Sequence, residues 1–144
     1  MKKITLYIGK TSYIEPKGKK ITSSDEVATE IRKLIGQDIE RKEFFCLITL
    51  SGASKVINSR IIHIGTLNQS LVHPREIFNP ALIDNSAGII IAHNHPSGTL
   101  KPSHSDIQVT QRLEEISKLV GIELVDHVIV TKLGFFSFTD KGLL

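Results

Sequence analysis

Apolar residues along the chain divide it into several expected β-strands. Residues 43–50 contain the apolar run 44–48, which is typical of a buried strand, and Ser51-Gly52 forms a turn before the alternating segment 55–64. These segments predict an antiparallel hairpin. Residues 88–92 are apolar at every position, as expected for a central strand covered on both faces. The last two expected strands, which form a closing hairpin, are 122–131 and 135–139.

Three helices are expected, one before the first of these strands and two between later ones, and each shows a recognisable start or end. Ser23-Ser24-Asp25-Glu26 has capping-box spacing, and Gly36 ends that helix. Pro74 suits the first position of a second helix, and a third runs from about 104 to 120. Helices interleaved with a mixed sheet predict the α/β (α+β) class. The expected core faces are Val27, Ile31 and Leu34; Ile77, Phe78, Ala81 and Leu82; and Val109, Leu113, Ile116 and Val120.

Length and cysteine content limit the class of protein. A chain of 144 residues that is 40% hydrophobic is sized for one domain. Its longest apolar stretch, 87–92, is far shorter than the roughly 20 residues of a membrane span, and no signal-type segment follows Met1, so we expect no membrane contact. The single cysteine, Cys46, excludes an internal disulfide and a thiolate-rich zinc site, and it fits the cytoplasm.

Positive charge is concentrated at the N-terminus. Residues 1–20 contain six lysines and one acid, a net charge of +5, which leaves −2 for residues 21–144. We therefore divide the chain into a basic N-terminal arm, 1–22, and a domain, 23–144. The arm could contact nucleic acid, or it could be a solvated tail.

Two histidines separated by one residue follow the apolar central strand. On an extended backbone residues i and i+2 project to the same side, so His93 and His95 can present ring nitrogens to one ion, and Asn94 points elsewhere. Pro96 favours an extended conformation for His95. The first turn of the next helix offers the carboxylate of Asp106 as a third ligand; the alternative is that Asp106 only caps the helix.

This ligand set predicts a catalytic site and requires a base. Two histidines and one carboxylate leave the fourth position of zinc for water, whose pKa the metal lowers to about 7. Glu43, at the start of a core strand, is the candidate base because burial there could raise the pKa of its carboxyl group. Ser103 has two interpretations: a helix N-cap, or a hydroxyl that donates to the oxyanion formed during attack.

Taken together, these residues resemble a known family. His93, His95, Ser103 and Asp106 match the His-x-His-x7-Ser-x2-Asp signature of JAB/MPN-type (JAMM) metalloproteases. A closer resemblance, to the RadC-like branch, covers about residues 43–138. The segments that carry it are Gly65-Thr66-Leu67-Asn68, Val72-His73-Pro74-Arg75-Glu76, Ala92-His93-Asn94-His95-Pro96-Ser97-Gly98 and Asp126-His127.

The resemblance implies a fold and a site. The fold is the JAB/MPN α/β domain, with a layout similar to that of cytidine deaminases. The site holds one Zn²⁺ through His93, His95 and Asp106, with Ser103 assisting the oxyanion. The family's catalytic glutamate lies just before the first core strand, which indicates Glu43, with Glu40 as the alternative. We expect His127 to be a core group or a residue behind the ligands.

Relatives with this motif cut peptide or isopeptide bonds, so the resemblance implies a zinc-dependent hydrolase with a protein or peptide substrate. Two alternatives remain: a DNA-associated role in repair or processing through the lysine-rich arm, and a metal-binding interaction module without turnover. A zinc deaminase needs His-x-Glu and Pro-Cys-x-x-Cys, which His93-Asn94-His95 and the single Cys46 do not supply. RadC-like proteins usually carry a helix-hairpin-helix region upstream, and we expect the roughly 40 residues before the first strand to be too few for it.

Overall fold

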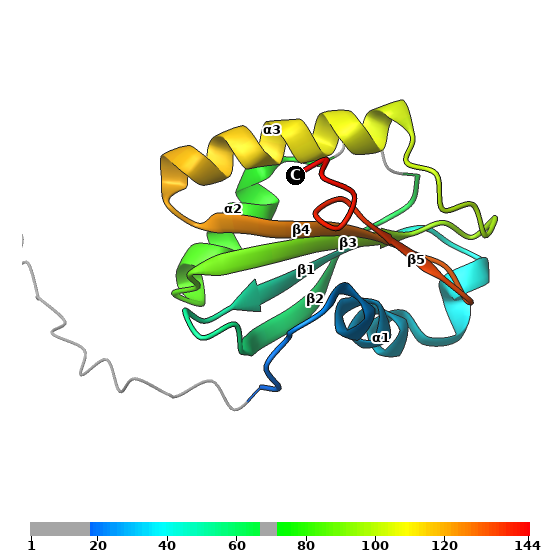
Figure 1. Cartoon of the computed structure of the whole chain (residues 1–144), viewed down its shortest axis with the longest axis horizontal. Helices are drawn as coiled ribbons and strands as arrows, with labels where there is room; N and C mark the ends of the chain where they lie inside the picture. The colour runs from blue at the N-terminus through cyan, green and yellow to red at the C-terminus, as the bar shows by residue number, and fades with distance from the viewer. Residues whose placement is uncertain (1–17, 67–71) are drawn as a thin grey trace, which may run out of the picture.

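A five-stranded mixed sheet forms the centre of the molecule (Figure 1). The computed structural model describes residues 18–66 and 72–144. The sheet order is β2-β1-β3-β4-β5, with β3 and β4 parallel and every other neighbouring pair antiparallel. Both predicted hairpins are therefore confirmed. The strands are β1 Phe44–Leu50, β2 Val56–Ile64, β3 Gly88–Asn94, β4 Glu123–Val130 and β5 Phe135–Ser137.

Within the described residues, three α-helices cover the two faces of this sheet (Figure 1), and the predicted α+β class is confirmed. The helix α1 (Ser24–Ile35) lies on one face, and α2 (Pro74–Ile83) and α3 (His104–Val120) lie on the other. A 3-10 turn, η1 (Gly36–Glu40), joins α1 to β1. As predicted, Ser23 caps α1 and Gly36 ends it. No helix among the described residues is both long and apolar enough to cross a membrane.

Alternation along the strands produces two separate cores. Phe44, Cys46 and Ile48 pack toward α1, whereas Phe45 and Leu47 pack with α2 and α3. The central strand β3 is buried at every position, as its continuous apolar sequence predicted.

Two of the expected core residues lie outside these cores. Leu82, 58% exposed, lies at the margin of the buried face of α2: it is about 40° around the helix from Phe78 but about 140° from Ile77. Val120, 38% exposed, is the last residue of α3, where Gly121 adopts a left-handed conformation and ends the helix.

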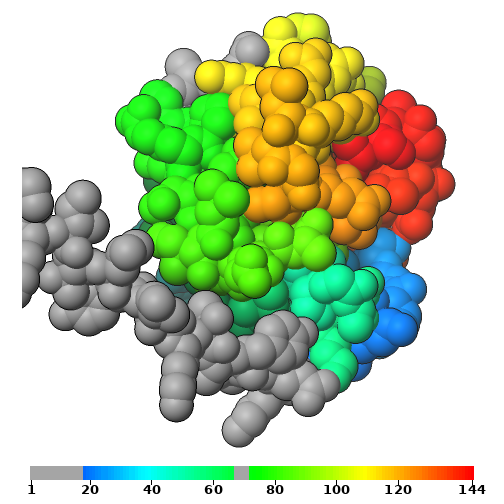
Figure 2. Space-filling model, turned by 90° about the vertical axis from the view of Figure 1, so that its left-hand side faces the viewer, coloured from blue at the N-terminus to red at the C-terminus, as the bar shows by residue number. Residues whose placement is uncertain are grey.

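The topology brings three element ends together at one edge of the sheet. Because β1 runs antiparallel to β3, it begins where β3 ends, and α3 starts after the loop that leaves β3. Figure 2 shows the opposite end of the molecule, where α2 (green) lies beside the end of α3 and the start of β4 (orange). The candidate site belongs to the edge at which β3 ends.

The predicted basic arm lies largely outside the described residues, which begin at residue 18. Its last part contacts the domain. The Val56 N–H donates to the Lys19 carbonyl over 3.1 Å, and the Ile21 N–H donates to the Ser54 carbonyl over 2.9 Å. Residues 19–21 thus pair with the backbone around the start of β2.

Candidate metal centre

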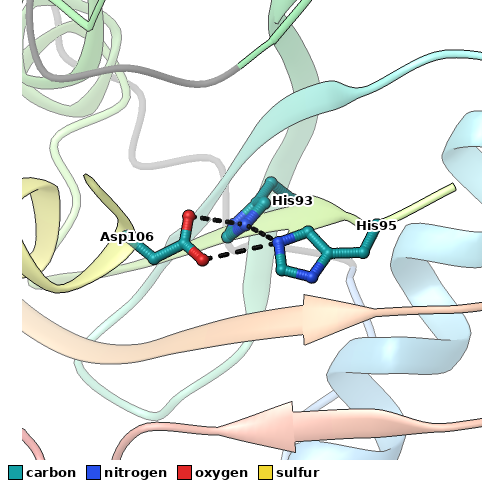
Figure 3. Close-up of side chains that lie close together, drawn as sticks. All are labelled: His93, His95 and Asp106. Atoms are coloured by element: carbon teal, nitrogen blue, oxygen red, sulfur yellow. Dashed lines mark hydrogen bonds and ion pairs between the residues drawn. The ribbon is translucent and has the colours of Figure 1, made fainter. Parts of the chain in front are cut away.

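The side chains of His93, His95 and Asp106 converge (Figure 3), and their candidate ligand atoms all lie within 4.8 Å of one another. His93 Nε2 lies 3.0 Å from His95 Nε2 and 3.0 Å from Asp106 Oδ1, and His95 Nε2 lies 3.4 Å from Asp106 Oδ2. The convergence that the sequence predicted is present.

Strand geometry explains why both histidines reach the same place. His93 lies within β3, and the main chain continues in register through His95, whose N–H donates to the Val130 carbonyl over 3.0 Å. The chain then turns sharply, with the Gly98 N–H donating to the His95 carbonyl and Gly98 at φ 83°, a value that favours glycine. The turn leaves His95 at the mouth of the site, while His93 is fully buried.

Asp106 reaches the site as part of the cap of α3. Its N–H donates to Ser103 Oγ over 3.1 Å, and its Oδ2 accepts from the Ser103 N–H over 2.7 Å, which completes a capping box. The same carboxylate faces both imidazoles. The two interpretations of Asp106, cap and ligand, are therefore compatible, because the cap holds the carboxylate in the orientation that faces the histidines.

A main-chain carbonyl determines which nitrogen of His95 faces the site. His95 Nδ1 lies 2.7 Å from the Thr99 carbonyl oxygen. A carbonyl only accepts hydrogen bonds, so Nδ1 carries the proton, and the Nε2 of a neutral His95 presents a lone pair to Asp106 and His93.

The donor set fits a metal ion. Ligand atoms placed tetrahedrally at about 2.0–2.1 Å from zinc lie roughly 3.4 Å apart, close to the separations among these three side chains. Lone pairs that converge at such distances repel one another unless a cation or a proton lies between them. Two imidazole nitrogens and one carboxylate are also a common zinc ligand set in catalytic sites.

Charges within the cluster shift two pKa values. Burial opposes ionisation of Asp106, but hydrogen bonding with His93 and His95 outweighs it, so the pKa of this carboxyl group lies well below its usual value. The pKa of His95 is raised, chiefly by Asp106, against the effect of burial; the Thr99 carbonyl and the charge of Glu43 raise it further. The carboxylate is therefore ionised, as a metal ligand must be.

Glu43 lies beside this cluster, immediately before β1. The β1–β3 register pairs Phe45 with His93, and continued by two residues it sets Glu43 level with His95. Its charge acts on the pKa of His95. Glu40, the alternative base, lies at the end of η1 and forms an exposed 2.8 Å ion pair with Lys132.

Asn94 connects the segment of His93 and His95 to the segment that carries Glu43. Its side chain, fully buried, points to the face opposite the histidines, as predicted. Oδ1 accepts from the Phe44 N–H over 2.7 Å, and Nδ2 donates to the carbonyls of Lys42 (2.8 Å) and Ile39 (2.7 Å). The main chain is therefore fixed on both sides of Glu43.

Ser103 is an N-cap in the structure, because its Oγ accepts from the Asp106 N–H. That bond uses an oxygen lone pair and leaves the hydroxyl proton to be donated elsewhere. The capping interpretation is confirmed, and the oxyanion role of Ser103 stays a prediction.

Two residues lie behind the candidate ligands. His127, fully buried in β4, lies with its Nε2 2.8 Å from His93 Nδ1, which fits the predicted place behind the ligands. Burial, followed by the charge of His93, keeps the pKa of His127 well below its usual value. Thr110, which sequence reasoning missed, contacts the other nitrogen of His127. Its position four residues after Asp106, on the same face of α3, is the signal that could have indicated it.

Fold and ligand cluster together define the class: an α+β JAB-type domain with a His-His-Asp centre at the end of its central strand. The profile of the RadC-like JAB domain matches residues 21–143, so the chain belongs to this family. The matched region extends beyond both ends of the resemblance found from motifs. Leu67 and Asn68 of those motifs lie outside the described residues.

Several relatives are similar over most of this chain. A UPF0758 protein of Geotalea uraniireducens is 45% identical over 104 residues, 72% of this chain and 46% of the relative. Others from Methanospirillum hungatei and Clostridium perfringens are 46% and 47% identical over 87% and 81% of this chain, covering 55% and 52% of their own lengths. The chain thus spans about half the length of the curated relatives it matches.

Proposed function

We propose that this domain is a zinc-dependent hydrolase that cleaves amide bonds, either peptide or isopeptide. The observation that carries the proposal is the convergence of His93, His95 and Asp106 at the end of β3, with the charge of Glu43 acting on His95. A carboxylate that is not among the three ligands, next to a centre with two histidines and one carboxylate, is the arrangement that water-activating zinc sites use.

His93, His95 and Asp106 would hold the zinc ion, which when bound supplies Lewis acidity toward water and the substrate carbonyl. Glu43 accepts a proton from the attacking water and returns it to the leaving amine. Ser103, exposed at the start of α3, donates its hydroxyl proton to the oxyanion. Asn94 holds the main chain around Glu43 so that the base stays level with His95.

A protein or peptide is the proposed substrate, as the family resemblance implies. His95 lies at the open side of the cluster, with its side chain 13% exposed, whereas His93 and Asp106 are buried. An extended polypeptide would therefore approach from the side of His95 and Ser103. On this path of approach the scissile carbonyl of the substrate also passes Glu43, which lies level with His95.

Zinc content and hydrolysis, measured together, test the proposal. We expect the wild-type chain to bind one zinc ion and to cleave members of a fluorogenic peptide and isopeptide library. His95→Ala should lose both properties. Glu43→Gln should keep zinc and lose about 10²–10⁴-fold in rate. Glu40→Gln is the matched control, because that carboxylate pairs with Lys132, and it should keep both.

Each failure has a separate meaning. Zinc loss in Glu43→Gln would show that Glu43 is a ligand and not the base. Zinc binding by the wild type without cleavage of any amide substrate would contradict the hydrolase and favour an interaction module.

A further inference from the structure

A series of hydrogen bonds runs behind His93. It starts at Nδ1 of His93 and ends at Asp106, the residue that faces Nε2 of His93. His93 Nδ1 lies 2.8 Å from His127 Nε2, and His127 Nδ1 lies 2.5 Å from Thr110 Oγ1. Thr110 Oγ1 in turn donates to the Asp106 carbonyl over 2.7 Å. The main-chain carbonyl of Asp106 is therefore the last acceptor of this series, and the carboxylate of the same residue faces His93 Nε2.

Only one assignment of donors and acceptors along this series of hydrogen bonds is consistent when a metal is bound. The Thr110 hydroxyl has one proton. It donates this proton in a hydrogen bond to the Asp106 carbonyl, which can only accept. Thr110 Oγ1 must then accept from His127, so Nδ1 of His127 carries a proton. The Nε2 of neutral His127 is left as an acceptor, so His93 donates to it from Nδ1. The remaining nitrogen of His93, Nε2, keeps its lone pair.

We propose that His127 and Thr110 are positioning residues that hold His93 in the tautomer whose Nε2 lone pair binds the metal. They do for His93 what the Thr99 carbonyl does for His95. His93 is too deeply buried to use water for this purpose, so the protein supplies a buried imidazole instead. The inference rests on the metal site of the proposed function and is independent of whether that site turns over a substrate.

Packing holds the His127 ring in the orientation that this role requires. The ring stacks on Phe138 at 4.6 Å between centroids, with an interplanar angle of 11°, and meets the edge of Phe45. Asp126 secures the segment that carries Phe138: its carboxylate accepts from the Ser137 hydroxyl (2.6 Å) and from the Thr139 N–H (3.0 Å). Asp126 therefore supports the ring of its neighbour, His127, through the segment that carries Phe138.

This series of hydrogen bonds also connects the elements that carry the proposed ligands. His93 comes from β3, His127 from β4, and Thr110 and Asp106 from α3. A shift of α3 along the sheet would stretch the Thr110–His127 contact and move the Asp106 carboxylate at once. We therefore expect loss of either positioning residue to loosen the whole ligand set.

Zinc affinity of the metal-free protein, measured by competition with a chromophoric chelator, tests the inference. Thr110→Val keeps the shape and removes the hydroxyl, and His127→Phe keeps a ring against Phe138 and removes the acceptor. Each should weaken zinc binding about 10–100-fold. Val109→Ala, which removes buried methyl groups next to Thr110, controls for a general loss of stability and should change the affinity less than about 2-fold.

Nitrogen-15 NMR of the imidazoles in the metal-free wild type gives a second, activity-independent readout. We expect a proton on Nδ1 of both His93 and His127, and in Thr110→Val a mixture of tautomers. A proton on Nε2 with none on Nδ1 of His93 would overturn the inference. Unchanged zinc affinity in Thr110→Val and His127→Phe, or equal weakening in Val109→Ala, would also overturn it. If zinc-loaded wild type cleaves nothing, the hydrolase proposal fails and this inference stands.

Discussion

Asn94 hydrogen-bonds the main chain on both sides of Glu43, through the carbonyl of Lys42 and the N–H of Phe44. The residue between His93 and His95 thus fixes the main chain that carries the carboxylate proposed as the base. Side chains alternate between the two faces of the sheet along β3. His93 and His95 therefore face one side, and Asn94 faces the other.

Replacing Asn94 should therefore affect stability and rate more than metal content. Asn94→Ala leaves Phe44 N–H and the carbonyls of Ile39 and Lys42 unpaired in a buried place, and we expect a loss of about 2–4 kcal/mol in the free energy of unfolding. The folded fraction should still bind zinc but hydrolyse more slowly. Urea denaturation and zinc analysis measure the two effects. An unchanged unfolding midpoint would contradict the role assigned to Asn94.

Ser103 can be tested as a cap and as an oxyanion donor separately. Ser103→Gly loses the hydroxyl but remains an acceptable N-cap, so we expect only a few tenths of a kcal/mol in stability. If the hydroxyl serves the oxyanion, kcat should fall about 10²–10³-fold in the same variant. Ser103→Thr keeps the hydroxyl and should keep most of the rate. Full activity in Ser103→Gly would leave Ser103 as a cap alone.

Local patterns predicted the elements and the convergence of His93, His95 and Asp106, for physical reasons. Alternation and the i, i+2 spacing are properties of a strand in isolation, so His93 and His95 were assignable without tertiary information. Thr110 and the role of Asn94 were not, because each depends on a partner from a distant segment: Thr110 on His127, and Asn94 on the segment before β1. The exposure of Leu82 likewise depends on which face of α2 meets the sheet.

A hydrogen-bonded carboxylate away from the candidate metal centre predicts how stability depends on pH. Asp84, at the end of α2, accepts hydrogen bonds from Thr49 (2.6 Å), Asn58 (3.1 Å) and Arg60 (3.1 Å). Burial alone would raise the pKa of Asp84, but the bonds from Arg60, Thr49 and Asn58 outweigh it and lower the pKa. The contribution is therefore present above the unfolded-state pKa of about 3.9 and is lost as pH falls toward the lower folded value.

Asp84→Asn should lose about 1–3 kcal/mol near neutral pH, since Arg60 keeps its charge without its partner. The difference from wild type should shrink as pH falls below about 4. Thermal unfolding of both proteins across this range measures it. Glu123→Gln, a change at an exposed carboxylate, is the control. A difference that stays constant down to acid pH would show that the loss of Asp84 acts through packing and not through its charge.

Cys46 should be unreactive while the protein is folded. Its side chain is fully buried in β1, and burial raises the pKa of its thiol to about 12, so almost no thiolate is present at neutral pH. We expect an aromatic disulfide reagent to modify it only as fast as the domain unfolds. Ala53→Cys, in an exposed turn, supplies a thiol that should react immediately. Fast modification of both thiols would contradict the burial of Cys46.

Whatever affinity the chain has for DNA should reside in its first 17 residues. Residues 18–144 contain 14 basic and 14 acidic residues and therefore carry no net charge, which gives them little long-range attraction to a polyanion, whereas Lys2, Lys3, Lys10 and Lys17 lie within residues 1–17. With four lysines, the slope of log affinity against log salt should be no steeper than about −3.6.

Deletion of residues 1–17 should abolish this affinity and leave zinc binding unchanged, because the ligands and the residues behind them lie in the sheet and α3. Titration of labelled duplex DNA at several salt concentrations measures both affinity and slope. Equal binding by the deletion variant and the full chain would place the contact on the domain surface. Absence of binding by the full chain even at low salt would leave the arm as a solvated tail, and with it the DNA-associated interpretation would lose its only support in the sequence.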